Sequence, residues 1–234
     1  MKVLGVKIDN LSKSEIFEKI KFFLSEPKFH QIATINPEFI IEAQSNEEFK
    51  NILNTSDLNI ADGIGLKLAF WRHRERLKCR LTGADLMKSL LHIANKKGFS
   101  VFLAANKDGL STWEETKTAI EKIYPDLIIF GDDIDIKNED YQILSSTCRI
   151  VFCNFGAPHQ EAFLKRQKND KIRLGVGVGG SFDYLTNKVR RAPNFFQFLG
   201  LEWLWRFLLQ PERFFRIFKA VIIFPIKIIL SAKG

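Results

Sequence analysis

Short apolar runs alternate with amphipathic stretches along most of the chain. Between most of these runs, apolar residues recur at the three- and four-residue spacing of helices. Buried runs separated by helices are typical of a largely parallel sheet covered on both faces. We therefore expect a Rossmann-like α/β fold with helices on both faces. The runs expected to form strands are residues 3–7, 31–35, 58–60, 99–104, 127–130, 149–155 and 172–178.

Two of the predicted helices carry a recognisable start signal. Ser12 is followed by Glu15, and Ser111 is followed by Glu114, each ahead of an apolar repeat of helical period. At this spacing the hydroxyl and the carboxylate bond each other's backbone N–H groups and form a capping box. We expect helices to begin just after Ser12 and just after Ser111.

Composition changes once along the chain. The 234 residues are 46% hydrophobic, which is enough for one full-sized α/β domain with its own core. Residues up to Pro193 contain no low-complexity linker, whereas the remainder is rich in aromatic and basic residues. We predict an α/β domain over residues 1–193 and a helical, membrane-binding appendage over residues 194–234.

Positive charge is concentrated in that appendage. The chain has a formal net charge of +8, and from Thr186 onward nine Lys and Arg face two acidic residues. These cations are interleaved with Phe, Trp, Ile and Leu, which favours an anionic membrane surface or a phosphorylated substrate over nucleic acid. Residues 214–230 are the most apolar stretch, but charges and Pro225 interrupt it, whereas a spanning helix needs about 20 mainly apolar residues. We expect this stretch to lie on the membrane.

The cysteines and the N-terminal residues bear on the cellular compartment. Cys79, Cys148 and Cys153 form an odd set without CxxC spacing, and the N-terminal residues carry no apolar run of signal-peptide length. Both observations favour a reducing cytoplasm, with the thiols buried in the core.

Candidate chemistry follows the predicted strands. In open α/β sheets, ligands collect outside the carboxyl ends of the strands, so polar residues at these points are candidates for a site. They are Thr34, Asn36, Asp62, His159, Gln160, Glu161 and Asp183.

Two of these positions allow a structural reading as well as a functional one. Asp62 stands where a strand ends between small residues, so its carboxylate can act as a general base, or it can cap a helix over residues 66–70. Residues 159–161 open a helix whose N–H groups favour an anion or a polar ligand. Pro158 beside them equally suits plain helix capping.

Three other patterns carry little weight. Residues 175–180 satisfy GxGxxG, but no βαβ unit follows them, so the dinucleotide fingerprint is weak. Asp133 and Asp135 lie in an acidic stretch that we interpret as a solvated loop rather than a Mg²⁺ site. The histidines show no zinc spacing, and we expect no metal site.

The appendage arginines are difficult to explain as ordinary surface. If a helix continues beyond Pro211, Arg213 and Arg216 are neighbours on it, one turn apart. Arginine binds phosphate oxygens in a bidentate manner, so with Arg206 this group can receive a diphosphate. Attraction to anionic lipid head groups is the alternative, and both can hold together.

Seven short pieces, in order, resemble the bacterial glycosyltransferases of the WecG/TagA/CpsF family. The likeness covers nearly the whole length. The pieces are residues 34–38, 61–65, 80–85, 156–161, 177–183, 191–193 and 202–206 followed by 211–213.

The resemblance implies an inverting transfer of an N-acetylmannosamine-type sugar from a UDP-sugar to a polyprenyl-pyrophosphate-linked sugar, without a metal or other cofactor. Asp62 then matches the proposed base. The substrate pocket would contain Thr34, Asn36, Arg80, Gln160, Glu161, Asp183 and Arg191. The residues closing over the UDP diphosphate would be Arg206, Arg213 and Arg216.

The family likeness also implies a peripheral enzyme on the cytoplasmic face of the membrane, and the apolar tail could form a homo-oligomer away from it. Two features depart from the family pattern. Ala104-Ala105-Asn106 replaces a Gly-Gly turn, and His159 occupies the variable position of a Pro-x-Gln-Glu motif. The competing hypotheses are an NAD(P)-dependent oxidoreductase that uses residues 175–180, and a non-enzymatic membrane-docking protein.

Overall fold

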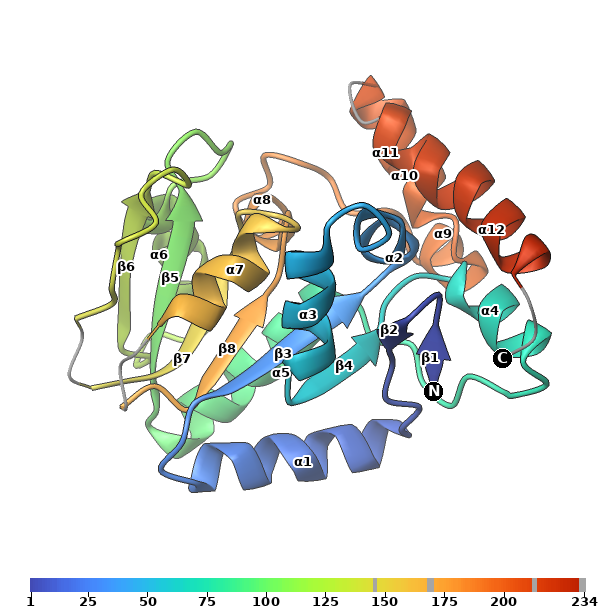
Figure 1. The fold of residues 1–234 in the computed structure, drawn as a ribbon. Coiled ribbons are helices and arrows are strands. Elements are labelled where there is room, and N and C mark those ends of the chain that lie inside the picture. The colour runs from blue at the N-terminus through green and yellow to red at the C-terminus, as the bar shows by residue number, and fades with distance from the viewer. Residues whose placement is uncertain (145–146, 168–170, 212–213, 232–234) are drawn as a thin grey trace.

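A six-stranded parallel sheet forms the centre of the molecule (Figure 1). The computed structural model describes residues 1–144, 147–167, 171–211 and 214–231. The strand order is β4-β3-β8-β7-β5-β6, so β8, the last strand in the chain, lies between β3 and β7. The strands are β3 (His30–Ile35), β4 (Leu58–Ala61), β5 (Ser100–Asn106), β6 (Ile129–Ile134), β7 (Cys148–Cys153) and β8 (Leu174–Gly177).

Both faces of the sheet are covered, as predicted. All six residues of β3 are buried, and successive residues enter different cores: Ile32 packs on one side, and Ala33 and Ile35 pack on the other. Because both sides of the strand are buried, the apolar residues Ile32 and Ala33 follow each other directly instead of alternating with exposed polar residues.

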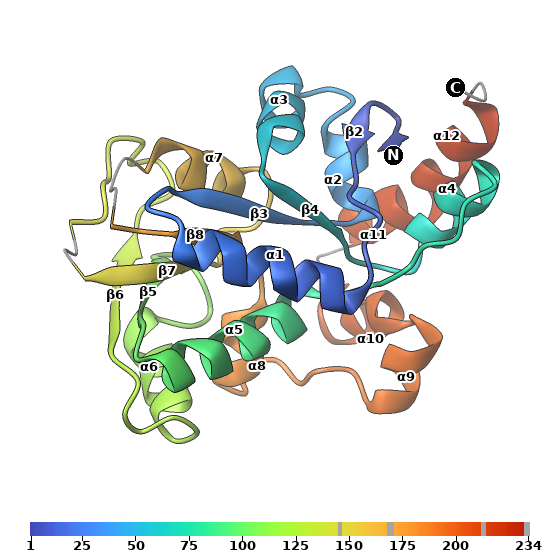
Figure 2. The ribbon, with the colours of Figure 1, turned by 90° about the horizontal axis from the view of Figure 1, so that it is seen from below.

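The helices divide between these two faces (Figure 2). Four contribute to the larger core: α1 (Lys13–Ser25), α5 (Gly83–Lys97), α6 (Trp113–Glu121) and α8 (Ser181–Leu185). The opposite face is covered by α2 (Pro37–Glu42), α3 (Glu47–Thr55) and α7 (His159–Arg166), with α4 (Leu66–Arg72) beside α2. The α/β fold class is therefore confirmed.

The C-terminal residues form a series of short helices, and the last of them pack beside α2 and α4 (Figure 1). They are α9 (Asn194–Leu199), α10 (Glu202–Leu209), α11 (Phe214–Phe218), the π-helical segment η2 (Lys219–Ile223) and α12 (Phe224–Leu230). Phe224 and Ile228 of α12 are buried in the same core as Phe39 of α2 and Phe70 of α4. Across the described residues, no helix is long and apolar enough to span a membrane.

The first predicted strand is wrong. Residues 3–7 do not join the main sheet but form part of a separate antiparallel hairpin of β1 (Lys2–Val3) and β2 (Val6–Lys7). Leu4 and Gly5 both adopt positive φ, which reverses the chain between the two short strands. A five-residue apolar pattern cannot distinguish such a turn from a continuous strand.

The prediction of an acidic loop over residues 131–140 is right for residues 135–140, which form mostly exposed turns, and wrong for residues 131–134. The strand expected at residues 127–130 is β6, which runs on to Ile134 and places Asp132 and Asp133 within an edge strand. Charged side chains are tolerated there because one edge of the strand is open to solvent. The Asp133 carboxylate accepts a hydrogen bond of 2.9 Å from the Trp113 backbone N–H, at the start of α6.

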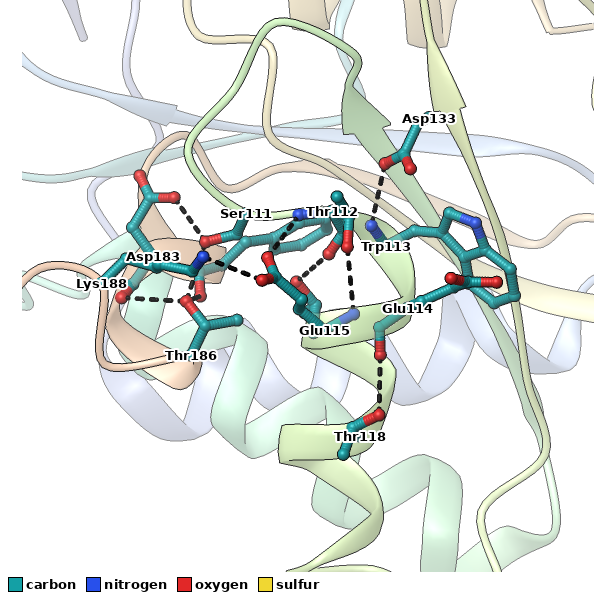
Figure 3. A network of polar contacts seen from close by, with 12 residues as sticks. Ser111, Thr112, Trp113, Glu114, Glu115, Thr118, Asp133, Asp183, Thr186 and Lys188 are labelled. Carbon is teal, nitrogen blue, oxygen red and sulfur yellow. Dashed lines mark hydrogen bonds and ion pairs between the residues drawn. The ribbon is translucent and has the colours of Figure 1, made fainter.

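One of the two predicted capping boxes is confirmed, and the other is displaced by one residue. Ser12 and Glu15 cap α1 as expected, whereas α6 is capped by Thr112 and Glu115. The Ser111 hydroxyl instead lies 2.8 Å from both Asp183 Oδ1 and Thr186 Oγ1 (Figure 3). Local spacing predicted Ser111 as the cap of α6, but its hydroxyl is instead bonded to α8 and the residue after it.

Candidate active site

A cavity of about 530 Å³ opens at the carboxyl edge of the sheet. Its walls come from the segments that follow β3, β4, β5, β7 and β8, and from α10 to α12. This volume falls in the range of small-molecule sites. Eight of the described residues predicted from the sequence line it: Thr34, Asn36, Asp62, Arg80, Gln160, Asp183, Arg191 and Arg216.

Asp62 follows β4 directly and contributes its carboxylate to the cavity wall. Its backbone N–H bonds the Ile35 carbonyl at 2.6 Å, and its Oδ2 accepts from the Gly83 N–H at 3.4 Å. The helix that follows begins at Leu66 with Gly65 in the cap position and has no side-chain cap. The helix-capping alternative for Asp62 is therefore wrong, and its carboxylate is placed where it can meet a ligand.

The end of β3 supplies two further polar side chains. Thr34 is buried, and its hydroxyl donates to the Gly177 carbonyl of β8 at 3.4 Å. Asn36 caps α2, because its Oδ1 accepts the Phe39 N–H at 3.1 Å. These bonds connect the cavity wall to both neighbouring elements.

The cavity is lined by three arginines from distant parts of the sequence: Arg80, Arg191 and Arg216. Arg80 donates to the Gln197 carbonyl of α9 at 2.9 Å, and Arg216 of α11 donates to Glu38 of α2 at 2.9 Å. The predicted Arg206 belongs to α10, but its side chain lies outside the described part of the chain. Arg213 lies outside the described residues altogether.

Arg191 joins the start of the C-terminal helices to the α/β domain. Its Nη2 lies 2.8 Å from Asp85, 3.4 Å from the Thr82 hydroxyl and 3.9 Å from Glu202. Because Asp85 and Thr82 stand at the start of α5, these contacts fix the segment before α9 against the cavity.

Gln160 and Glu161 lie in the first turn of α7, but their surroundings differ. Gln160 reaches the cavity wall although it is 2% exposed, whereas Glu161 is fully buried behind it and does not line the cavity. Burial raises the pKa of the Glu161 carboxyl from 4.5 to about 8. The hydrogen bond from Gln160 acts in the opposite direction and only partly offsets that increase.

Asp183 is tied to the loop between β5 and α6. Its Oδ1 accepts the Ser111 hydroxyl, and nearby Lys188 pairs with Glu115 of α6 at 2.8 Å (Figure 3). This network orders the loop from Asn106 to Leu110, which forms another part of the cavity wall.

Three backbone N–H groups of the glycine-rich segment already have partners within the protein. The Val178 N–H bonds the Cys153 carbonyl, the Gly179 N–H bonds Gln160 Oε1, and the Ser181 N–H bonds the Val178 carbonyl. A dinucleotide fingerprint needs such N–H groups for pyrophosphate. These bonds argue against the oxidoreductase hypothesis.

The cavity lining does not include His159, Asp133 or Asp135. His159 lines a separate hollow of about 160 Å³ between α3 and α7. Across the described residues, no group of three or more His, Cys, Asp or Glu side chains is arranged to hold a metal ion.

Several residues of the site escaped the sequence analysis. Glu38 follows Asn36 closely, yet its role depends on Arg216, which is far away in the sequence. Asn106 and Asn154 line the cavity and bond each other across β5 and β7 at 2.7 Å. Both stand at or just after strand ends, so the rule that selected Asp62 also applies to them.

Together, the parallel sheet and a polar cavity at its carboxyl edge, lined by three arginines and five carboxylates, define an α/β protein with a small-molecule site. More specifically, the chain belongs to the glycosyl transferase WecG/TagA/CpsF family, whose sequence profile matches residues 1–233.

Relatives with known names agree with this assignment. The chain is 33% identical to the N-acetylglucosaminyldiphosphoundecaprenol N-acetyl-beta-D-mannosaminyltransferase of Bacillus subtilis (strain 168), over 90% of this chain and 80% of that protein. It is 30% identical to a protein of the same name from Staphylococcus aureus (strain MRSA252), over 97% of this chain and 91% of the relative. Family and names indicate a glycosyltransferase of cell-surface polysaccharide synthesis.

Proposed function

We propose that this protein transfers an N-acetylmannosamine-type sugar from a UDP-sugar to polyprenyl-diphosphate-linked N-acetylglucosamine, with inversion at the anomeric carbon. The acceptor is inferred from the names of the relatives, which act on N-acetylglucosaminyldiphosphoundecaprenol. The observation that carries the proposal is that one cavity is lined by the Asp62 carboxylate and by Arg80, Arg191 and Arg216.

This set of groups suits a single displacement. As the acceptor hydroxyl attacks the anomeric carbon it must lose its proton, which the Asp62 carboxylate can accept. Negative charge develops at the same time on the departing UDP diphosphate. Arginine side chains can stabilise that charge by charge-assisted hydrogen bonds, so the proposed reaction needs no metal ion.

A peripheral position on the cytoplasmic face of the membrane would bring the cavity to its lipid-linked acceptor. The C-terminal helices expose Phe214, Phe215, Ile226, Ile229 and Leu230 to solvent. Apolar residues interleaved with cations are typical of segments that lie in an anionic membrane surface. We propose that α11 to α12 make this contact.

Substitution of Asp62 by Asn tests the proposed base. UDP release should be measured with polyprenyl-diphosphate-linked N-acetylglucosamine and a panel of UDP-sugars in EDTA. We expect kcat of Asp62→Asn to fall about 10²- to 10⁴-fold, the usual range for loss of a general base. Asp126→Asn, at an exposed position before β6, is the matched control and should behave as wild type.

The outcomes of this assay separate the parts of the proposal. Wild-type rates in Asp62→Asn would remove Asp62 as the base, and loss of transfer in EDTA would contradict the metal-free reaction. Absence of UDP release with every donor, together with intact vesicle binding, would favour a non-enzymatic docking protein.

A further inference from the structure

A buried pair of side chains, Gln160 and Glu161, connects the two loops that bound the cavity after β7 and β8. Gln160 Oε1 accepts the backbone N–H of Gly156 at 3.1 Å and that of Gly179 at 3.0 Å. Both glycines have positive φ and stand in turns of the cavity wall. A single amide oxygen therefore holds two turns that lie far apart in the sequence.

The orientation of the Gln160 amide is set by Glu161. Gln160 Nε2 donates to Glu161 Oε1 at 2.7 Å, so the nitrogen points to the carboxyl group and the oxygen to the two N–H groups. The reversed amide would direct its NH₂ group at two donors, which would leave buried polar groups unsatisfied. Glu161 is the acceptor that distinguishes the two orientations.

Neighbouring elements hold the pair in place. Gln31 of β3 donates to the Glu161 backbone carbonyl at 3.0 Å. A Cβ at position 177 would collide with the Gln160 amide and would lie 2.7 Å from Glu161 Oε1, so β8 needs glycine where the pair crosses it. The Gly177 carbonyl in turn accepts the Thr34 hydroxyl, which lines the cavity. The pair thus lies in contact with β3, β8 and both turns.

We propose that Glu161 is a positioning residue for sugar transfer: it fixes the Gln160 amide, and Gln160 holds the turns at Gly156 and Gly179 in the geometry that the substrate requires. Glu161 does not line the cavity, so it acts through Gln160. The inference rests on the proposed function for the identity of the reaction. The clamp, by which we mean the hydrogen bonds from Glu161 through Gln160 to Gly156 and Gly179, is a property of the fold.

Two substitutions and a matched control test this role. Glu161→Ala removes the acceptor, whereas Glu161→Gln keeps an oxygen that can accept from Gln160 Nε2. The control is Gln167→Ala, which removes another buried side chain at the end of α7. Gln167 accepts the Ile143 N–H at 3.0 Å and donates to the Tyr141 carbonyl at 3.2 Å, and it does not line the cavity.

Amide hydrogen exchange at Gly156 and Gly179 reports the clamp without reference to activity. We expect both amides to be protected in the wild type and in Glu161→Gln, and to lose protection in Glu161→Ala. Gln167→Ala should leave them protected. Unchanged protection in Glu161→Ala would overturn the clamp whatever reaction the protein catalyses.

Steady-state kinetics of the same variants then test whether the clamp contributes to sugar transfer. We expect kcat/KM of Glu161→Ala to fall about 100-fold, the effect of a small misplacement of substrate-binding groups. Glu161→Gln should remain within about threefold of wild type. Gln167→Ala should lower thermal stability and retain wild-type kcat and KM below its unfolding transition.

Two kinetic outcomes would overturn the positioning role: wild-type kcat/KM in Glu161→Ala, or an equal loss in Gln167→Ala. If the wild type transfers no sugar from any donor, the proposed function fails, and UDP affinity by calorimetry replaces kcat/KM as the readout for the same variants. Affinity equal to wild type in Glu161→Ala would then overturn the positioning role.

Discussion

At the scale of single residues, the polar groups of the cavity also have structural partners. Asn36 caps a helix, Arg216 pairs with a carboxylate, and Asp183 receives a hydroxyl from another loop. Such contacts reduce the freedom of the side chains before a ligand arrives, which lowers the entropic cost of binding. Substitutions here should therefore alter both binding and local order.

The buried carboxyl of Glu161 predicts a specific pH dependence of stability. Its pKa is about 8 in the folded protein against an ordinary value of 4.5, so between these pH values the unfolded chain loses this proton while the folded chain retains it. The unfolded state binds fewer protons, and the free energy of unfolding should fall as pH rises from 4.5 to 8.

Glu161→Gln should remove this contribution. We expect its stability relative to wild type to increase between about pH 5 and pH 8 in urea unfolding experiments. The control is Gln167→Ala, which removes a buried side chain that does not titrate, so its difference from wild type should stay constant with pH. A constant difference for Glu161→Gln as well would show that the carboxyl is ionised in the folded state.

Arg216 should contribute directly to the affinity for UDP. A bidentate, charge-assisted contact with phosphate is worth about 1.5–3 kcal/mol, so Arg216→Ala should weaken UDP binding about 10- to 100-fold. Arg216→Lys should give an intermediate loss, because it keeps the charge without the planar fork.

Calorimetry with UDP at constant ionic strength measures these effects. Lys227→Ala provides the control, because Lys227 is exposed on α12 and does not line the cavity. UDP affinity equal to wild type in Arg216→Ala would remove this arginine from the diphosphate site.

At the scale of elements, α12 has two faces with different roles. Phe224 and Ile228 are buried against α2 and α4, whereas Ile226, Ile229 and Leu230 are exposed. The first face attaches the helix to the domain, and the second is free to meet a membrane. An ordinary surface helix is polar on its outer face, so the exposed apolar residues of α12 mark a candidate contact surface.

Two phenylalanines in this region should therefore give opposite phenotypes. Phe224→Ala removes a fully buried ring and should cost about 3–5 kcal/mol of stability. Phe215 is 75% exposed, so Phe215→Ala should leave stability nearly unchanged and weaken binding to lipid vesicles. Thermal unfolding and vesicle sedimentation of both variants provide the measurements. Equal stability losses would contradict the assignment of the two faces.

At the scale of the whole molecule, charge is distributed unevenly. From Thr186 onward, nine cations less two acids leave seven of the eight net positive charges, in the segment that leads into and includes the C-terminal helices. The exposed apolar side chains of α11 and α12, together with exposed Lys219 and Lys227, would orient the molecule toward an anionic bilayer, with the cavity beside these helices.

Vesicle binding by the full chain should accordingly depend on lipid charge and salt. We expect strong binding to vesicles containing about 30% phosphatidylglycerol, weak binding to pure phosphatidylcholine, and a marked loss between about 50 and 500 mM salt because screening shortens electrostatic attraction. Sedimentation of the protein with each vesicle type checks this. Equal binding to both lipids at all salt concentrations would exclude an electrostatic contribution.

The sequence determined the parts of this protein that depend on local periodicity. Six of the seven predicted strands exist, because strands inside a covered sheet carry mainly apolar residues, and short apolar runs reveal them. The Ser12 capping box formed because all its partners lie within one helical turn. The rule that ligands collect after parallel strands also placed Asp62 and Thr34 at the cavity.

Tertiary structure decided what local sequence leaves open. Whether Ser111 caps a helix or binds Asp183 depends on a contact 72 residues away, and the partner of Arg216 lies 178 residues away. The position of β8 between β3 and β7 brings Gln160 and Gly177 together, and burial there raises the pKa of Glu161. Pairing, burial and shared hydrogen bonds arise from the packing of distant segments, so they appear only once the chain has folded.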